Sequence, residues 1–176
     1  MSSKTNARVL LAVAAGIGVI GAAYFARTSS NAAPAGVQTY RNLSRAHVTG
    51  AVQYDQSPPV GGAHWARWAN CGVYTQTIPN ELAVHSLEHG AVWITYRPDL
   101  EADQITALQE TARGQSYLLV SPYPDQEAPI VLSAWGHQLT LESLDPERIE
   151  SFIEAYQQGP QTPEPGAPCY GGVFPS

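Results

Sequence analysis

Lysine is almost missing from this sequence, and charge of either sign is scarce. Lys4 is the only lysine among 176 residues, and charged residues make up 14% of the chain, below the roughly 25% of typical globular proteins. After residue 27, six basic residues stand against fifteen acidic ones, a net charge of −9. Because nucleic acids and anionic lipid headgroups are bound by basic surfaces, this composition argues against both as partners of the domain.

Long apolar runs are missing too, with one exception near the N-terminus. Residues 9–26 are eighteen residues without a charge or a proline, and they lie between Arg8 and Arg27. As a helix they would span roughly 27 Å, just enough for a bilayer core. We predict an uncleaved signal anchor; a cleaved signal peptide, with its cleavage site near Ala32 or Ala33, is the alternative. Both place the remainder of a single-pass cell-membrane protein outside the cytoplasm, in the periplasm or the extracellular space.

The sulfur-containing residues are few. Apart from Met1 there is no methionine, which argues against a methionine-rich Cu(I) carrier. Cys71 and Cys169 are the only cysteines, and an even count in an exported protein indicates a disulfide. A thiolate pair on a metal is the alternative, although the separation does not resemble a CxxC ligand spacing.

Composition divides the chain into four parts. Residues 1–27 form the predicted membrane anchor, 28–46 a polar tether, 47–158 an extracytoplasmic domain, and 159–176 a tail. The tail holds five prolines and four glycines, so it should lack regular structure and follow the surface of the domain. A bond between Cys71 and Cys169 would pin it there.

Within the domain, strands and helices follow one another without strict alternation. Strands are predicted at 47–54, 91–96, 117–120, 130–134 and 137–141. A helix follows the cap residue Asp145, with Pro146 at its first position, and another spans about 99–113. A short helix over 81–89, capped by Asn80 and ended by Gly90, carries two histidines. We therefore predict an α+β fold with a mostly antiparallel sheet, two main helices and a short histidine-bearing helix.

Five histidines are the main functional signal, and His85 and His89 form the most informative pair. On a helix they lie one turn apart on one face and can bind one ion at about 2.0–2.1 Å per nitrogen. On a strand they would be about 13 Å apart and could not share a metal. The non-functional alternative is two histidines on a helix surface or in a core hydrogen bond.

The same segment spells H-x-x-E-H, the inverted zinc-protease motif. There Glu88 would activate a water, and a downstream glutamate such as Glu164 would complete the zinc site. Five-residue patterns recur by chance, so a zinc peptidase is a remote alternative. We expect Glu88 instead to orient His89 by accepting its second ring N–H.

His64 is the best third ligand, because its loop is flanked by glycines and can adapt its backbone to reach the pair. His47 and His137 are additional candidates. Imidazole and carboxylate donors suit zinc and Cu(II), so we predict a copper or zinc site. The residues thus favour a metal-binding protein over an enzyme. The main alternative is an interaction or structural subunit of a membrane complex, with a membrane protein as partner and purely structural histidines.

Several ordered motifs carry a family resemblance. They are His47-Val48, Pro58-Pro59, Gly72-Val73-Tyr74, the run from Val84 to Gly90, Ala134-Trp135-Gly136 and Thr162-Pro163-Glu164-Pro165-Gly166. Over about residues 45–170 the chain resembles an uncharacterised membrane-anchored bacterial family, domain of unknown function 3105. The resemblance implies an extracytoplasmic domain behind one N-terminal span, and His64, His85 and His89 match histidines of the family. It implies no activity.

Overall fold

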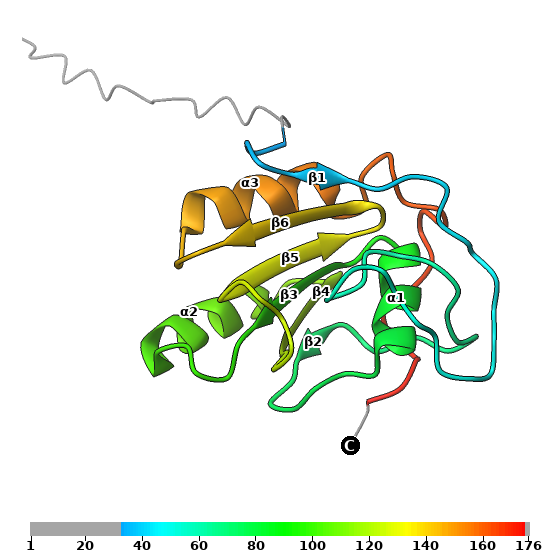
Figure 1. The fold of residues 1–176 in the computed structure, drawn as a ribbon, viewed down its shortest axis with the longest axis horizontal. Coiled ribbons are helices and arrows are strands. Elements are labelled where there is room, and N and C mark those ends of the chain that lie inside the picture. Colours follow the sequence, from blue (N-terminus) through cyan, green and yellow to red (C-terminus); the bar gives the residue numbers. More distant parts are fainter. Residues whose placement is uncertain (1–32, 175–176) are drawn as a thin grey trace, which may run out of the picture. The chain divides into compact units, whose positions relative to one another are not determined.

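The computed structural model describes residues 33–174, which form a six-stranded sheet with three helices (Figure 1). The strands are β1 (Gln38–Thr39), β2 (Gly72–Val73), β3 (Val92–Tyr96), β4 (Leu118–Pro122), β5 (Ile130–Ala134) and β6 (His137–Leu141). The helices are α1 (Asn80–Glu88), α2 (Ala102–Ala112) and α3 (Pro146–Tyr156). The predicted anchor at 1–27 lies outside the described residues. Within residues 33–174, no helix has the length and apolar character to cross a bilayer.

The sheet is mixed, so the prediction of a mostly antiparallel sheet was wrong. In the order β1-β6-β5-β3-β4-β2, the pairs β1–β6, β6–β5 and β5–β3 are antiparallel, whereas β3–β4 and β4–β2 are parallel. For β3–β4 the cause is α2, which crosses back over the sheet between the two strands and returns the chain in the same direction. The α+β class itself is confirmed.

Two apolar clusters cover the two faces of the sheet. Alternate side chains of β3 divide between them: Val92 and Ile94 face the cluster that includes α2 and α3, whereas Trp93 faces the cluster that includes α1. The stripe predicted for α3 contributes to the first cluster, where Ile149 and Phe152 are buried. Helix α1 therefore lies alone on the other face, beneath the loops that precede it.

Of the two helix caps predicted from sequence, one is confirmed and the other is wrong. Asp145 caps α3, since its Oδ1 accepts a hydrogen bond from the backbone N–H of Arg148 at 3.1 Å. Asn80 does not cap α1; its side-chain amide donates instead to the Tyr123 hydroxyl at 3.2 Å. The predicted strand at 47–54 is also wrong. That segment keeps only an isolated bridge between His47 and His64.

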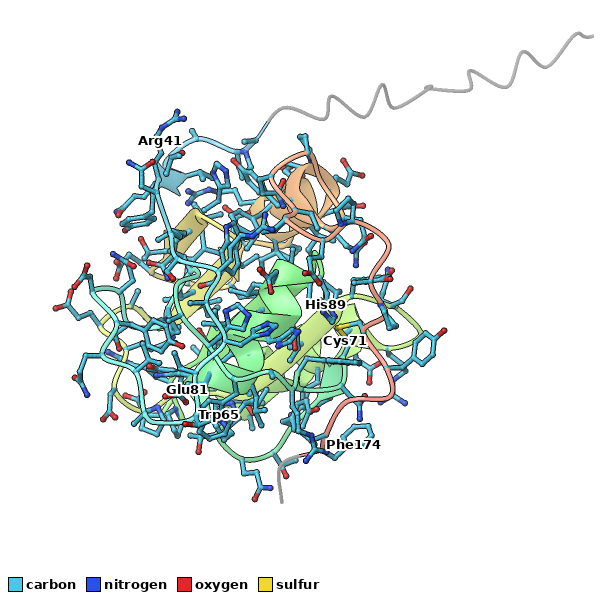
Figure 2. All side chains as sticks on the ribbon, turned by 90° about the vertical axis from the view of Figure 1, so that its right-hand side faces the viewer. Arg41, Trp65, Cys71, Glu81, His89 and Phe174 are labelled. Atoms are coloured by element: carbon cyan, nitrogen blue, oxygen red, sulfur yellow. A yellow bond between two sulfur atoms is a disulfide. The ribbon has the colours of Figure 1, made fainter. Side chains whose placement is uncertain are left out.

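The C-terminal tail is attached to the α1 side of the sheet. Cys71 and Cys169 are joined by a disulfide, with Cα atoms 5.4 Å apart. The backbone N–H of Cys71 donates to the Cys169 carbonyl at 2.8 Å, and the Tyr117 hydroxyl donates to the Ala167 carbonyl at 2.9 Å. Figure 2 shows Cys71 and His89 on the side of α1 along which the tail runs.

Candidate metal centre

Helix α1 is the base of the site, and it is enclosed on nearly every side. Every residue from Glu81 to Glu88 is buried, polar residues included. Its first turn is closed by the Pro79 carbonyl, which accepts from the N–H groups of Leu82 and Ala83. Leu87 packs toward the sheet. The polar side chains of the opposite face must therefore find partners in the loops and the tail.

The loop from Arg45 to His64 brings two further histidines over this helix. The N–H of Val48 donates to the His64 carbonyl at 2.8 Å, and the N–H of His64 donates to the Ala46 carbonyl at 3.1 Å. This short parallel bridge places the two imidazoles side by side, with ring centroids 5.0 Å apart. The His85 ring lies 5.0 Å from the His47 ring and 4.9 Å from the His64 ring.

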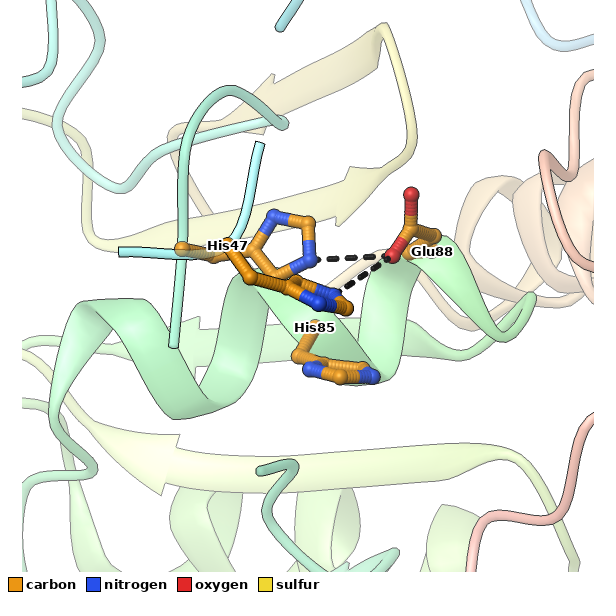
Figure 3. A group of neighbouring side chains, drawn as sticks. His47, His85 and Glu88 are labelled. Carbon is orange, nitrogen blue, oxygen red and sulfur yellow. Dashed lines mark hydrogen bonds and ion pairs between the residues drawn. The ribbon is translucent and has the colours of Figure 1, made fainter. Parts of the chain in front are cut away.

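Three imidazoles and a carboxylate converge there. One potential ligand atom from each of His47, His64, His85 and Glu88 lies within 4.8 Å of the others. Glu88 Oε2 is 2.9 Å from His64 Nε2 and 3.8 Å from His47 Nε2, as the dashed lines in Figure 3 mark. His64, His85 and Glu88 are at most 4% exposed, whereas the His47 side chain is 46% exposed. The group thus opens to solvent at His47.

Backbone carbonyls hold three of the rings in one tautomer. Nδ1 of His64 lies 2.8 Å from the Gly62 carbonyl oxygen, and Nδ1 of His85 lies 2.6 Å from that of Trp65. Nδ1 of His89 lies 2.8 Å from the Pro168 carbonyl oxygen. Because a carbonyl only accepts, each Nδ1 must carry the hydrogen. A neutral ring in this state presents the lone pair of Nε2 to the site, as metal-binding histidines do.

His89 lies beside the four-residue group and not within it. Its Nε2 is 3.0 Å from Nε2 of His85 and 3.5 Å from a carboxylate oxygen of Glu164 in the tail. The Trp68 ring packs against both histidines, with centroids 4.8 Å from His89 and 5.5 Å from His85. Two Nε2 lone pairs at this distance repel, so a proton or a metal ion must lie between them.

The electrostatics disfavour a proton on His85. Burial lowers the pKa of His85 to about 4. The hydrogen bond to the Trp65 carbonyl opposes this shift, and the neighbouring His89, His64 and His47 add to it. The lone pair of His85 is therefore available at neutral pH. Arg45 Nε, on the solvent side, is 3.5 Å from Glu88 Oε1 and pairs with the buried carboxylate.

The structure thus brings together most of the residues that the sequence singled out. His64 and His85 are in the group, His89 adjoins it, and the additional candidate His47 belongs to it. The other additional candidate, His137, lies elsewhere: its Nδ1 is 3.3 Å from the Thr39 hydroxyl, and its ring stacks on Tyr156.

The contacts of the Glu88 carboxylate differ from those expected. It does not orient His89, because the Pro168 carbonyl takes that place, and its carboxylate lies at the Nε2 atoms of His64 and His47. It is therefore a candidate ligand. Its position three residues after His85, on the same helix face, was the signal that could have shown this. Sequence reasoning also missed Arg45, for which the pattern carried no signal.

Comparison with known proteins gives a family and no relative of known activity. No curated protein and no solved structure matches the chain. A family described as Protein of unknown function (DUF3105) matches residues 47–171, a span that contains the four-residue group, His89 and Glu164. The matched span begins at His47 and covers well over half of the 176 residues, and the chain belongs to the DUF3105 family.

Proposed function

We propose that the protein is a membrane-anchored extracytoplasmic domain that binds copper or zinc for metal handling or delivery. The ligands are Nε2 of His64, His85 and His89, with His47 and the Glu88 carboxylate completing the donor set. One observation carries the proposal: backbone carbonyls take the Nδ1–H groups of His64, His85 and His89, so that Nε2 is the atom that each ring presents to the buried group or to its edge.

The donor set supports these two metals. Neutral imidazole suits zinc and Cu(II), and one carboxylate is compatible with both. Burying a carboxylate is costly unless its charge is compensated. A divalent cation would add to the positive charge that Arg45 places beside Glu88, which is 2% exposed. The four-residue group already supplies the four ligands that zinc usually takes.

The location rests on the sequence. Residues 9–26 are apolar and flanked by basic residues, which supports an N-terminal anchor with the domain outside the cytoplasm. The disulfide between Cys71 and Cys169 suits the same oxidising compartment. A small anchored domain with a histidine site that is exposed at one side could accept or release its ion at that side.

One preparation tests both parts of the proposal. Membranes from cells producing the full-length chain are washed with carbonate, and the chain is purified in detergent through a tag without histidine. Copper and zinc are then measured by elemental analysis. We expect the chain to stay in the washed membranes and to hold metal. His64→Ala should weaken binding on the order of a hundredfold, since even outer partners of metal ligands contribute 10–100-fold.

His137→Ala is the matched control, because this histidine contacts Thr39 and Tyr156 and not the cluster. It should bind as the wild type does. If the wild-type chain holds no metal and takes up none from added zinc or copper, the metal-binding proposal is wrong. The interaction or structural subunit of a membrane complex would then remain as the explanation. A chain released by the carbonate wash would contradict the anchor.

A further inference from the structure

We propose that the centre holds two metal ions, and that the second is bound by His85, His89 and Glu164. The proposal rests on the proposed function, because it requires that the histidine cluster binds metal at all. Beyond the proposed function, it assigns a separate metal site to the side of α1 that faces the C-terminal tail, and the tail supplies one of the ligands. The first ion then belongs to His47, His64 and Glu88.

Six donor side chains surround this part of α1, more than one zinc or copper ion takes. Donors that share a tetrahedral ion at about 2.0–2.1 Å lie roughly 3.3–3.4 Å apart. Around Glu88 Oε2 the distances are 2.9 Å to His64 Nε2 and 3.8 Å to His47 Nε2. Around His89 Nε2 they are 3.0 Å to His85 Nε2 and 3.5 Å to Glu164 Oε2. The close contacts therefore form two sets, one around Glu88 and one around His89. His85 lies within reach of both, since one of its ring nitrogens is also within 4.8 Å of the first set.

A second ion would account for the close approach of His85 and His89. Each ring donates Nδ1–H to a carbonyl, so their Nε2 lone pairs face each other at 3.0 Å. An ion in the first set could take the lone pair of His85, but it would leave that of His89 without a partner. An ion shared by both lone pairs removes their repulsion, and Glu164 supplies negative charge beside it.

The second site has fixed walls. The backbone N–H of Glu164 donates to the Glu88 carbonyl at 3.1 Å, which ties this part of the tail to the end of α1. Pro168, whose carbonyl orients His89, precedes the disulfide-bonded Cys169. The Trp68 ring packs against both histidines. The Glu164 side chain is 45% exposed, so the site has its own opening to solvent.

The arrangement has a chemical consequence. Each ion has three protein ligands, so each keeps at least one coordination position for water or an external ligand. The external ligand expected here is therefore a small anion or a water-derived hydroxide.

The test is a metal count on the full-length chain, purified in detergent through a tag without histidine. The chain is dialysed to equilibrium against zinc, and zinc per chain is measured by elemental analysis. We expect two zinc ions for the wild type and one for Glu164→Gln. Glu154→Gln is the control, since it removes an equivalent carboxylate from the exposed side of α3 and should keep two.

The possible results separate the two proposals. One zinc in both the wild type and Glu164→Gln would overturn the second site and leave the proposed function standing. Two zinc ions in Glu164→Gln would also overturn it, because Glu164 would then hold neither. No zinc in the wild type would overturn both proposals.

Discussion

At the scale of single residues, the spacing of the histidines along the helix predicted which of them lie together. The backbone groups that orient their rings could not be predicted. His85 and His89 could be paired from the sequence because the i, i+4 separation brings side chains onto one helix face. The carbonyls of Gly62, Trp65 and Pro168 that orient the rings could not be predicted. Every residue offers a carbonyl, and only the folded chain decides which of them meets an imidazole.

The depressed pKa of His85 predicts how the metal-free protein responds to acid. In the unfolded chain a histidine titrates near 6.5, whereas in the folded protein burial brings the pKa of His85 to about 4. Between these values the unfolded state binds more protons, so stability present above pH 6.5 is lost as the pH falls toward 4. The slope for one proton is at most about 1.4 kcal/mol per pH unit.

Urea unfolding with a chelator present, at pH 7 and pH 4.5, measures this effect. The wild type should lose more free energy of unfolding between the two pH values than His85→Gln, which cannot titrate. The variant also serves as the control for carboxylates that titrate in the same range. Equal losses in the two proteins would mean that His85 is not buried in its neutral form.

At the scale of elements, the end of α1 was predictable from sequence and its beginning was not. Gly90 ends the helix as expected, in a left-handed conformation with φ of +92°. Asn80 looked like a cap because its type favours that position, but tertiary contact with the Tyr123 hydroxyl takes its amide instead. The parallel pairing of β3 and β4 was missed for a similar reason, since α2 was recognised as a helix but not as a crossover.

A glycine series tests how tightly α1 joins the tail. Alanine at Gly90 would require a positive φ and would meet the side chains of Gln158 and Thr162. We expect Gly90→Ala to lower the free energy of unfolding by roughly 2–4 kcal/mol, the sum of backbone strain and overpacking. At Gly114 the φ is also positive, but nothing lies near the added methyl group. Gly114→Ala should therefore lower the free energy of unfolding by only about 1–2 kcal/mol.

Gly50→Ala is the control of the series, because nothing lies within 4 Å of its added methyl group. It should change stability by no more than about 0.5 kcal/mol. Urea titrations of the three variants give the order directly. If Gly90→Ala were no worse than Gly114→Ala, the tail would not be packed against the end of the helix.

At the scale of the whole molecule, the site could be predicted only in part because three distant segments build it. The loop around His47 and His64, helix α1, and the tail around Glu164 and Pro168 meet only in the folded chain. Cysteine counting alone indicated that the tail returns to the body, and the bond between Cys71 and Cys169 agrees with this.

The disulfide should therefore support both stability and the second ion. It joins residues 98 positions apart, and losing a bond of this kind typically costs about 2–5 kcal/mol. In the double variant Cys71→Ser, Cys169→Ser the tail is also free to leave α1. His89 would then lose the Pro168 carbonyl that orients it, and Glu164 would move away. We expect this variant to bind one zinc ion where the wild type binds two.

Leu108→Ala separates this effect from general destabilisation. Leu108 is fully buried in the cluster on the opposite face of the sheet, and its truncation should cost a similar 2–5 kcal/mol without touching the tail. Zinc per chain and urea unfolding are measured for both proteins under conditions in which both remain folded. Leu108→Ala should keep two zinc ions. If both variants lose the same ion, or if the cysteine variant keeps two, the tail does not position His89, and the disulfide serves stability alone.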